Sequence, residues 1–211
     1  MVKAHWEILD EKRQAILPLL KHFKDRFYLA GGTALALQLA HRDSIDFDFF
    51  TSADFNSEDL LREIKDVFAG HAIELIQAGN KTLNIVIDQD IKASFFCIKE
   101  QLLAPTLDFD CFNVASITDV ACMKISALLR AALKDYVDLY YIFKQQSLNE
   151  VLNNCKKKYP GFDEVVYLKA LVSFDDIEDS DILFEKGQKI TKEQIKKDFE
   201  SRVKLYLERA L

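Results

Sequence analysis

One short segment, residues 29–50, constrains this chain most, because it combines a glycine pair, a helical run and two aspartates on an apolar strand. Side chains alternate between the two faces of a strand, so Asp46 and Asp48 are expected on the same face. The neighbouring apolar residues are expected to face the core: Ile45, Phe47 and Phe49. Adjacent carboxylates repel each other, and their oxygens suit a hard cation such as Mg²⁺ or Mn²⁺. The pair is therefore a predicted metal site, although Asp-X-Asp alone is also common on exposed strand edges.

The glycine pair supports the metal site. Gly31 and Gly32 follow the apolar run 27–30 and precede a helix that begins near Thr33. Such a turn lets backbone N–H groups approach a phosphate, and the N-terminus of the helix adds a favourable partial charge. A phosphate-binding turn so close to two metal-binding carboxylates indicates a nucleoside triphosphate (NTP) bound through Mg²⁺.

The chain resembles a known family over roughly residues 27–143. The glycine pair, the helix 34–40, His41-Arg42 and the run 44–50 form one motif, and residues 121–130 with 134–140 form a second, helical one. Together they are similar to the AbiEii/AbiGii toxin nucleotidyltransferases, a branch of the polymerase-β-like superfamily. The resemblance implies an α+β fold, with a mixed sheet and helices followed by a C-terminal helical bundle. It also implies Mg²⁺-dependent transfer of a nucleoside monophosphate to a hydroxyl of RNA (such as a tRNA end) or of a small molecule, a toxin-like role and a cognate antitoxin protein.

The second motif adds candidate site residues. Lys124 and Asp135 are eleven positions apart, which is almost the same azimuth on a helix but about 16 Å along its axis. Either the chain breaks near residues 129–133, or only one of the two lies in the site. Lys124 could neutralise triphosphate charge or extend to solvent. Asp135 and Asp138 could bind the acceptor, position Lys134 or Arg130, act as base, or form local salt bridges.

The candidate residues therefore fall into two groups. The expected catalytic set is Asp46, Asp48, Lys124 and Asp135. The expected nucleotide-binding set is Gly31, Gly32, Thr33, Arg42, Lys124, Arg130 and Lys134. Arg42 is included because a guanidinium matches phosphate oxygens, whereas Phe47, Phe49 and Phe50 are assigned to core packing and not to base stacking.

A third carboxylate is expected from the superfamily but is not evident here. Members usually carry it on a neighbouring central strand, and the corresponding segment, residues 91–96, has Ser94 at its centre and no acid. Asp88 and Asp90 are the nearest carboxylates, and their position favours turn formation. This departure keeps a second function open, that of a catalytically weak nucleotide-binding or interaction module.

Composition limits the remaining classes. The chain has 211 residues, is 49% hydrophobic and carries a net charge of −6, which argues against broad nonspecific nucleic-acid binding and allows only a local basic groove. Neither a signal peptide nor a membrane span is evident, so a soluble, cytoplasmic protein is expected. The four cysteines lack disulfide or zinc spacing and are expected to be reduced.

The periodicity of the chain predicts its elements. Before residue 115, helices are expected at 6–23, 33–40 and 57–70, and strands at 27–30, 45–50, 72–76, 82–87 and 91–98. A short strand is expected at 114–116, and helices at 119–132, 135–144, 148–157, 162–171 and 192–211, with an acidic loop at 174–181. The predicted domains are a nucleotidyltransferase domain, 1–115, and a helical bundle, 116–211.

Overall fold

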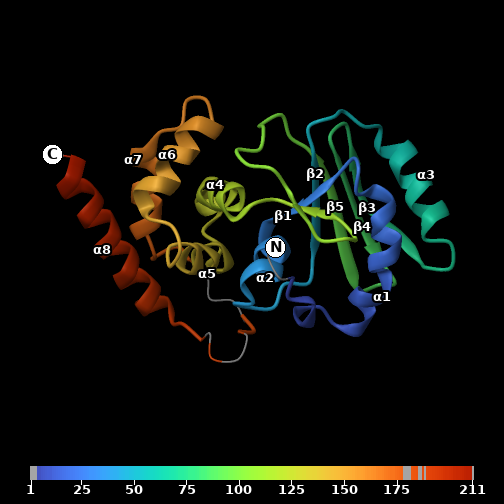
Figure 1. Cartoon of the computed structure of the whole chain (residues 1–211), viewed down its shortest axis with the longest axis horizontal. Helices are drawn as coiled ribbons and strands as arrows, with labels where there is room; N and C mark the ends of the chain where they lie inside the picture. Colours follow the sequence, from blue (N-terminus) through green and yellow to red (C-terminus); the bar gives the residue numbers. More distant parts are fainter. Residues whose placement is uncertain (1–3, 178–181, 185–186, 188, 211) are drawn as a thin grey trace.

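A seven-stranded mixed sheet occupies one half of the protein and helices form the other half (Figure 1). The structure, a computed structural model, describes residues 4–177, 182–184, 187 and 189–210. The strand order is β3-β4-β5-β2-β1-β7-β6. The strands are β1 (Tyr28–Ala30), β2 (Phe47–Thr51), β3 (Ile73–Gly79), β4 (Thr82–Ile87), β5 (Ile91–Cys97), β6 (Leu107–Asp108) and β7 (Asn113–Val114).

Strand β2 lies at the centre of this sheet. It runs antiparallel to β1 and parallel to β5. Burial alternates along it as the sequence predicts, with Phe47 and Phe49 fully covered and Asp48 half-buried between them. The expectation for Ile45 was wrong: this residue precedes the strand and is 49% exposed, because the alternation starts only at Phe47.

The N-terminal segment is divided into three short helices where the sequence predicts one. They are η1 (Trp6–Ile8), α1 (Glu11–Leu20) and η2 (Lys21–Phe23). Leu9 is the C-cap of η1, and Asp10 caps α1, because its side chain accepts a hydrogen bond from the Arg13 backbone N–H at 2.8 Å. Pro18 lies inside α1. Two further helices, α2 (Gly31–Leu39) and α3 (Ser57–Val67), complete the predicted alternation of helices and strands.

Helices dominate the chain after β7. They are α4 (Ile117–Ala127), η3 (Leu128–Arg130), α5 (Leu133–Ile142), α6 (Leu148–Lys158), α7 (Glu164–Val172) and α8 (Lys192–Ala210). The predicted helix 119–132 stops early, because α4 passes into η3 and Ala131 adopts a left-handed conformation with φ of 51°. Of the predicted acidic loop, residues 178–181 lie outside the described residues.

The elements stack in layers that place α2 in the interior. Helices α1 and α3 cover one face of the sheet, whereas α2 lies between its other face and α4 and α5 (Figure 1). Ala34, Leu35 and Leu37 of α2 are completely buried. One continuous hydrophobic cluster runs from Ile8 to Val203 and crosses residue 115. The division into 1–115 and 116–211 stays a prediction.

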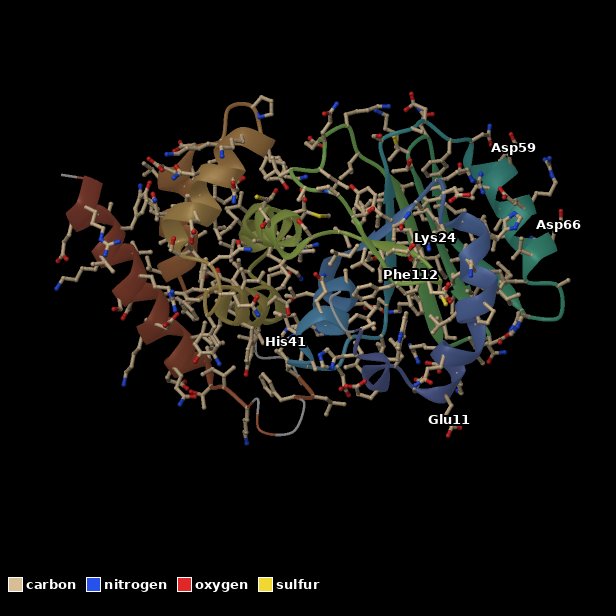
Figure 2. The ribbon with its side chains drawn as sticks, viewed as in Figure 1. Glu11, Lys24, His41, Asp59, Asp66 and Phe112 are labelled. Atoms are coloured by element: carbon tan, nitrogen blue, oxygen red, sulfur yellow. The ribbon has the colours of Figure 1, made fainter. Side chains whose placement is uncertain are left out.

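Side chains separate clearly into interior and surface groups. Phe112 lies among the packed rings beneath the sheet, whereas Asp59 and Asp66 project outward from α3 (Figure 2). Cys97, Cys111, Cys122 and Cys155 each carry a free thiol, and their reduced state stays a prediction. In the part of the chain that the structure describes, no helix combines the length and the apolar character that crossing a membrane requires.

Candidate active site

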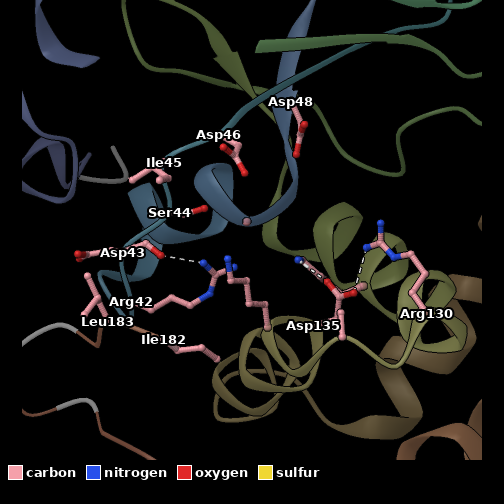
Figure 3. A pocket seen from close by; sticks show the side chains of 14 residues that line it. Arg42, Asp43, Ser44, Ile45, Asp46, Asp48, Arg130, Asp135, Ile182 and Leu183 are labelled. Carbon is pink, nitrogen blue, oxygen red and sulfur yellow. Dashed lines mark hydrogen bonds and ion pairs between the residues drawn. The ribbon is translucent and has the colours of Figure 1, made fainter. Parts of the chain in front are cut away.

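The two predicted metal-binding aspartates lie at the start of β2 and open into a cavity of about 490 Å³. Figure 3 shows both carboxylates pointing into this space, which we call the first cavity. Asp48 lies between Ala30 of β1 and Ser94 of β5 in the strand register. The first cavity is lined by Gly32, Arg42, Asp43, Ser44, Ile45, Asp46, Asp48, Lys124, Arg130, Ala132, Lys134, Asp135, Ile182 and Leu183.

The charge on Asp48 is destabilised by its surroundings. Burial raises the pKa of Asp48, and the neighbouring charge of Asp46 raises it further, while Lys124, a hydrogen bond from Ser94 and Arg130 act in the opposite direction. A divalent cation would relieve this repulsion. Among the residues that the structure describes, no cluster of three or more His, Cys, Asp or Glu side chains is placed to hold a metal ion. Two carboxylates still fit Mg²⁺, which usually takes one or two protein carboxylates together with phosphate and water oxygens.

The glycine pair borders the carboxylates closely. Gly31 has a φ of +72°, and a Cβ atom on it would lie 3.1 Å from Asp48 Oδ2. A Cβ atom on Gly32 would lie 2.6 Å from Arg42 Nη2, which is too close for any side chain without movement of Arg42. Gly32 lines the first cavity at the N-terminus of α2, so the turn lies where a phosphate-binding turn is predicted.

Thr33 has a different position from the one expected. Its hydroxyl forms a hydrogen bond with Ser44 Oγ at 2.9 Å and another with the Asp46 carbonyl oxygen. The Thr33 side chain is buried and therefore fixes the backbone that leads into the aspartates. Ser44, which the sequence analysis did not select, lines the cavity; it precedes β2, so strand alternation gives no signal for it.

The turn between α4 and α5 brings the second motif to the aspartates. Because η3 and Ala131 reverse the chain direction, Lys124 Nζ and Asp135 Oδ1 are 2.7 Å apart, far closer than a straight helix would allow. This confirms the first of the two predicted alternatives, a chain break near residues 129–133. Arg130 Nη2 lies 3.0 Å from Asp135 Oδ2, so each carboxylate oxygen of Asp135 is bound by a cation.

Asp138 is the anchor of a buried charge cluster behind the cavity. It lies 2.6 Å from Lys124 Nζ, accepts hydrogen bonds from Arg42 Nε and Nη2 at 2.7 and 2.9 Å, and lies 2.8 Å from His41 Nε2. Burial by itself raises the pKa of Asp138, but Lys124, Arg42 and the hydrogen bonds from His41 and Arg42 outweigh it and hold that pKa well below its usual range. His41 lies between α2 and α5, as Figure 2 shows.

The same cluster keeps Lys124 charged. Burial lowers the pKa of Lys124, but the charges of Asp138 and Asp135 more than compensate and raise it. Lys124 is buried and does not extend to solvent, so one of the two interpretations of its sequence position is excluded. Arg42 lines the first cavity, yet its guanidinium is held by Asp138 and, through Nη1, by the Asp43 carbonyl. Arg130 and Lys134 are exposed at the cavity mouth.

A segment far along the chain closes one side of the first cavity. Ile182 and Leu183 line it, the Asp43 N–H donates to the Leu183 carbonyl at 2.8 Å, and Arg42 forms a β-bridge with Phe184. The sequence analysis missed these residues. No periodic or motif signal marks them, because the contact joins segments about 140 positions apart.

The predicted position of a third carboxylate is occupied by Ser94, directly opposite Asp48. Asp88 belongs to the β4–β5 turn, where it lies 2.7 Å from His71 Nδ1 and accepts the Ala72 N–H. Asp90 pairs with Lys12 at 3.1 Å. These contacts confirm that both residues serve the turn, about 13 Å along the strand from Ser94.

Comparison with known proteins agrees with this arrangement. The sequence model of one family, described as "Nucleotidyl transferase AbiEii toxin, Type IV TA system", matches residues 19–208. The chain belongs to this AbiEii nucleotidyltransferase family. The match covers the sheet, both site motifs and the helices up to α8, so the resemblance and the α+β nucleotidyltransferase fold expected from the sequence are both confirmed.

Individual relatives agree with the family. A protein of Aquifex aeolicus is 35% identical over 189 residues, which cover 86% of this chain and 88% of that protein. The structure of JHP933 from Helicobacter pylori has a TM-score of 0.60 at 18% identity and covers 95% of this chain and 94% of its own. The Megavirus polyadenylate synthase matches with a TM-score of 0.50 at 14% identity, over 63% of this chain and 31% of that enzyme. The two structures are similar in fold alone.

Proposed function

We propose that the protein transfers a nucleoside monophosphate from an NTP to a hydroxyl acceptor, with Mg²⁺ or Mn²⁺ as cofactor. The supporting observation is the first cavity, in which the carboxylates of Asp46 and Asp48 face the cations Lys124, Arg130 and Lys134, beside a glycine turn at a helix N-terminus. A triphosphate needs both of these groups: oxygen ligands for its metal ion and cations for its phosphates.

The residues have distinct roles in this proposal. Asp46 and Asp48 would hold the metal ion, which would neutralise phosphate charge when bound. Gly32 would offer its backbone to the β- and γ-phosphates, and Lys124, with Arg130 and Lys134, would stabilise the charge that develops on the leaving pyrophosphate. The acceptor oxygen forms a bond with the α-phosphorus and loses its proton to solvent water, while the bond from the α-phosphorus to the pyrophosphate oxygen breaks and pyrophosphate leaves.

Asp135 and Asp138 act as positioning residues in this proposal. Both oxygens of Asp135 are paired with cations, and Asp138 is completely buried behind the cavity. Neither carboxylate is therefore placed to take the proton of the acceptor hydroxyl. They instead hold Lys124 in the wall of the first cavity, where it would contact the phosphates. Asp138 also holds Arg42 beside Gly32.

The biological context follows the family. The family is described as the toxin of a type IV toxin–antitoxin system, which supports a toxin-like role and a cognate antitoxin protein as partner. RNA, including tRNA ends, and small molecules are the proposed acceptors, and a cytoplasmic location is the corresponding expectation.

A second function is supported by one observation, the presence of Ser94 where the superfamily usually carries its third carboxylate. Without a base at that position, the protein would bind an NTP but would transfer its nucleoside monophosphate poorly or not at all. This alternative is a catalytically weak nucleotide-binding or interaction module. It shares the first cavity with the enzyme and differs only in turnover.

Binding of the NTP is tested by titration calorimetry with each Mg-NTP. The variants Asp46→Asn and Asp48→Asn should lose Mg²⁺-dependent NTP binding, because each removes one of the two negative charges that bind the metal ion. Both should remain folded, because each substitution also relieves the repulsion between the two carboxylates. Asp66→Asn, an exposed aspartate on α3, is the matched control and should bind as the wild type does. Unchanged affinity in both site variants would refute the metal site.

A further inference from the structure

A second cavity, of about 600 Å³, lies on the other side of Asp48 from the first. Gly32, Asp48, Lys124 and Arg130 line both cavities, so the two spaces meet at the carboxylate and the lysine. The rest of the second cavity differs in character from the first. Its walls are largely aromatic and apolar. They include the rings of Phe50 and Phe96, the side chain of Met123 and the cation Lys81.

The floor of the second cavity is the sheet face that carries Asp48. Asp48 pairs with Ser94 and Phe50 pairs with Phe96 in the parallel register of β2 and β5, so the two rings follow the two polar residues on one face. The ring centroids of Phe50 and Phe96 are 5.2 Å apart with an interplanar angle of 31°. Phe50 also packs partly against the core. Its assignment to core packing alone was therefore incomplete, because Phe47 and Phe49 point to the opposite, fully buried face.

The opposite wall leaves room above the two rings. It is formed by α4, where Met123 is half-buried and is followed by the small residues Ser126 and Ala127. Methionine adapts its shape to flat ligands. Cations stand at the edge, because Lys81 and Arg130 are both exposed. Asp48 is the one acid among the described residues that line this cavity.

We propose that the second cavity is the acceptor subsite and that it binds a planar ring with an adjacent phosphate, as in the terminal nucleotide of a single strand. The inference rests on the proposed function. In-line transfer requires the attacking oxygen and the leaving pyrophosphate on opposite sides of the α-phosphorus. Lys134 lines the first cavity alone and, with the shared Lys124 and Arg130, gives that cavity the cations suited to pyrophosphate, so the acceptor approaches from the side of Phe50 and Phe96.

The chemistry of the second cavity fits this ligand. Aromatic side chains stack on bases of any sequence, and nearby lysine and arginine residues hold the backbone phosphate. Lys81 and Arg130 form a small basic group at this cavity. Such a group is consistent with a protein whose net charge is −6. Phe50 also stacks on Tyr28, with ring centroids 6.0 Å apart and an interplanar angle of 26°.

The test compares two ligands on the same variants. Phe96→Leu removes the ring and keeps apolar volume, and Lys81→Ala removes the cation at the edge. The matched controls are Phe55→Leu, a half-buried phenylalanine packed on Phe27, and Lys65→Ala, an exposed lysine on α3. The probes are a short single-stranded oligoribonucleotide of mixed sequence and the Mg²⁺ complexes of non-hydrolysable α,β-methylene analogues of the NTPs.

The expected result separates the two ligands. Phe96→Leu should weaken oligoribonucleotide binding about tenfold, Lys81→Ala should weaken it several-fold, and the affinity for the NTP analogues should stay at the wild-type value. Both controls should match the wild type with either probe. Lys81→Ala changes an exposed side chain, so it keeps the test decisive should Phe96→Leu impair folding.

Four outcomes would overturn the inference. Weaker binding of the NTP analogues by Phe96→Leu would place the donor's base in the second cavity. Equal oligoribonucleotide binding by the variants and their controls would refute the acceptor subsite. A wild type that binds the analogues but no oligoribonucleotide would refute it too. A wild type that binds no NTP analogue would contradict the proposed function itself, and the inference with it.

Discussion

Asp138 shows how much of this site depends on a single buried side chain. It joins α5 to α4 through Lys124 and to the segment after α2 through Arg42 and His41. The Lys124 and Arg42 cations are both held in place by a carboxylate that no solvent reaches. At the scale of the residue, the site is therefore a small set of charges whose positions depend on one another.

Removal of the Asp138 charge should destabilise the fold strongly. We expect Asp138→Asn to lower the free energy of unfolding by about 3–5 kcal/mol, because Lys124 and Arg42 would be left buried without their shared anion. The folded pKa of Asp138 is depressed, so its contribution to stability is present above the unfolded value, about 3.9, and is lost as pH falls through the folded pKa. Urea unfolding at several pH values should show a flatter acid dependence in the variant, and Asp66→Asn serves as control. Wild-type stability in Asp138→Asn would refute the role of the cluster.

Local spacing made some of these residues predictable and others not. The period of two along a strand placed Asp46 and Asp48 on one side, and helix geometry required a break between Lys124 and Asp135. The partner of Arg42 was not predictable, because Asp138 lies 96 positions away and the sequence indicates only nearby cations, Lys134 and Arg130, as partners for it. Ile45 was misplaced because the sequence does not show where the strand begins.

The connection between α4 and α5 is the element on which the site depends most. The 3₁₀ turn η3 and the left-handed Ala131 reverse the chain, which brings Lys124 to Asp135 and sets Arg130 and Lys134 at the mouth of the first cavity. The periodicity predicted both helices here but placed the end of the first one at residue 132, because left-handed residues leave no signal when they are not glycine. The short strand β6 was missed for a similar reason, since two residues show no periodicity.

Two substitutions at Ala131 test the turn. The free energy of unfolding of Ala131→Gly should stay within about 0.5 kcal/mol of the wild-type value. Glycine relieves the strain of the left-handed conformation, but its greater freedom in the unfolded chain offsets this gain. Ala131→Val should lower the free energy of unfolding by about 1–2 kcal/mol, because a β-branched residue tolerates this backbone conformation poorly. Denaturant titration of both variants gives the comparison. Equal stability of the two would argue against the left-handed turn.

At the scale of the whole molecule, the groups to which we assign catalysis come from both of its halves. The carboxylates stand on the central strand β2, the cations come from α4 and the turn after it, and α2 lies buried between them. The hydrophobic cluster continues across this boundary. The fold class was predictable from alternating strands and helices, whereas the side-by-side placement of the two cavities depends on strand order and packing, which sequence periodicity does not encode.

Pyrophosphate release tests the central claim most directly. The protein is incubated with each NTP, Mg²⁺ and either RNA or a panel of small hydroxyl compounds, and pyrophosphate and labelled acceptor are measured together. The account predicts that the wild type releases pyrophosphate in equal amount to the acceptor labelled, that omission of Mg²⁺ abolishes both, and that Asp46→Asn shows neither while Asp66→Asn matches the wild type. Binding of Mg-NTP without pyrophosphate release for any NTP and acceptor would contradict nucleotidyl transfer and favour the nucleotide-binding module.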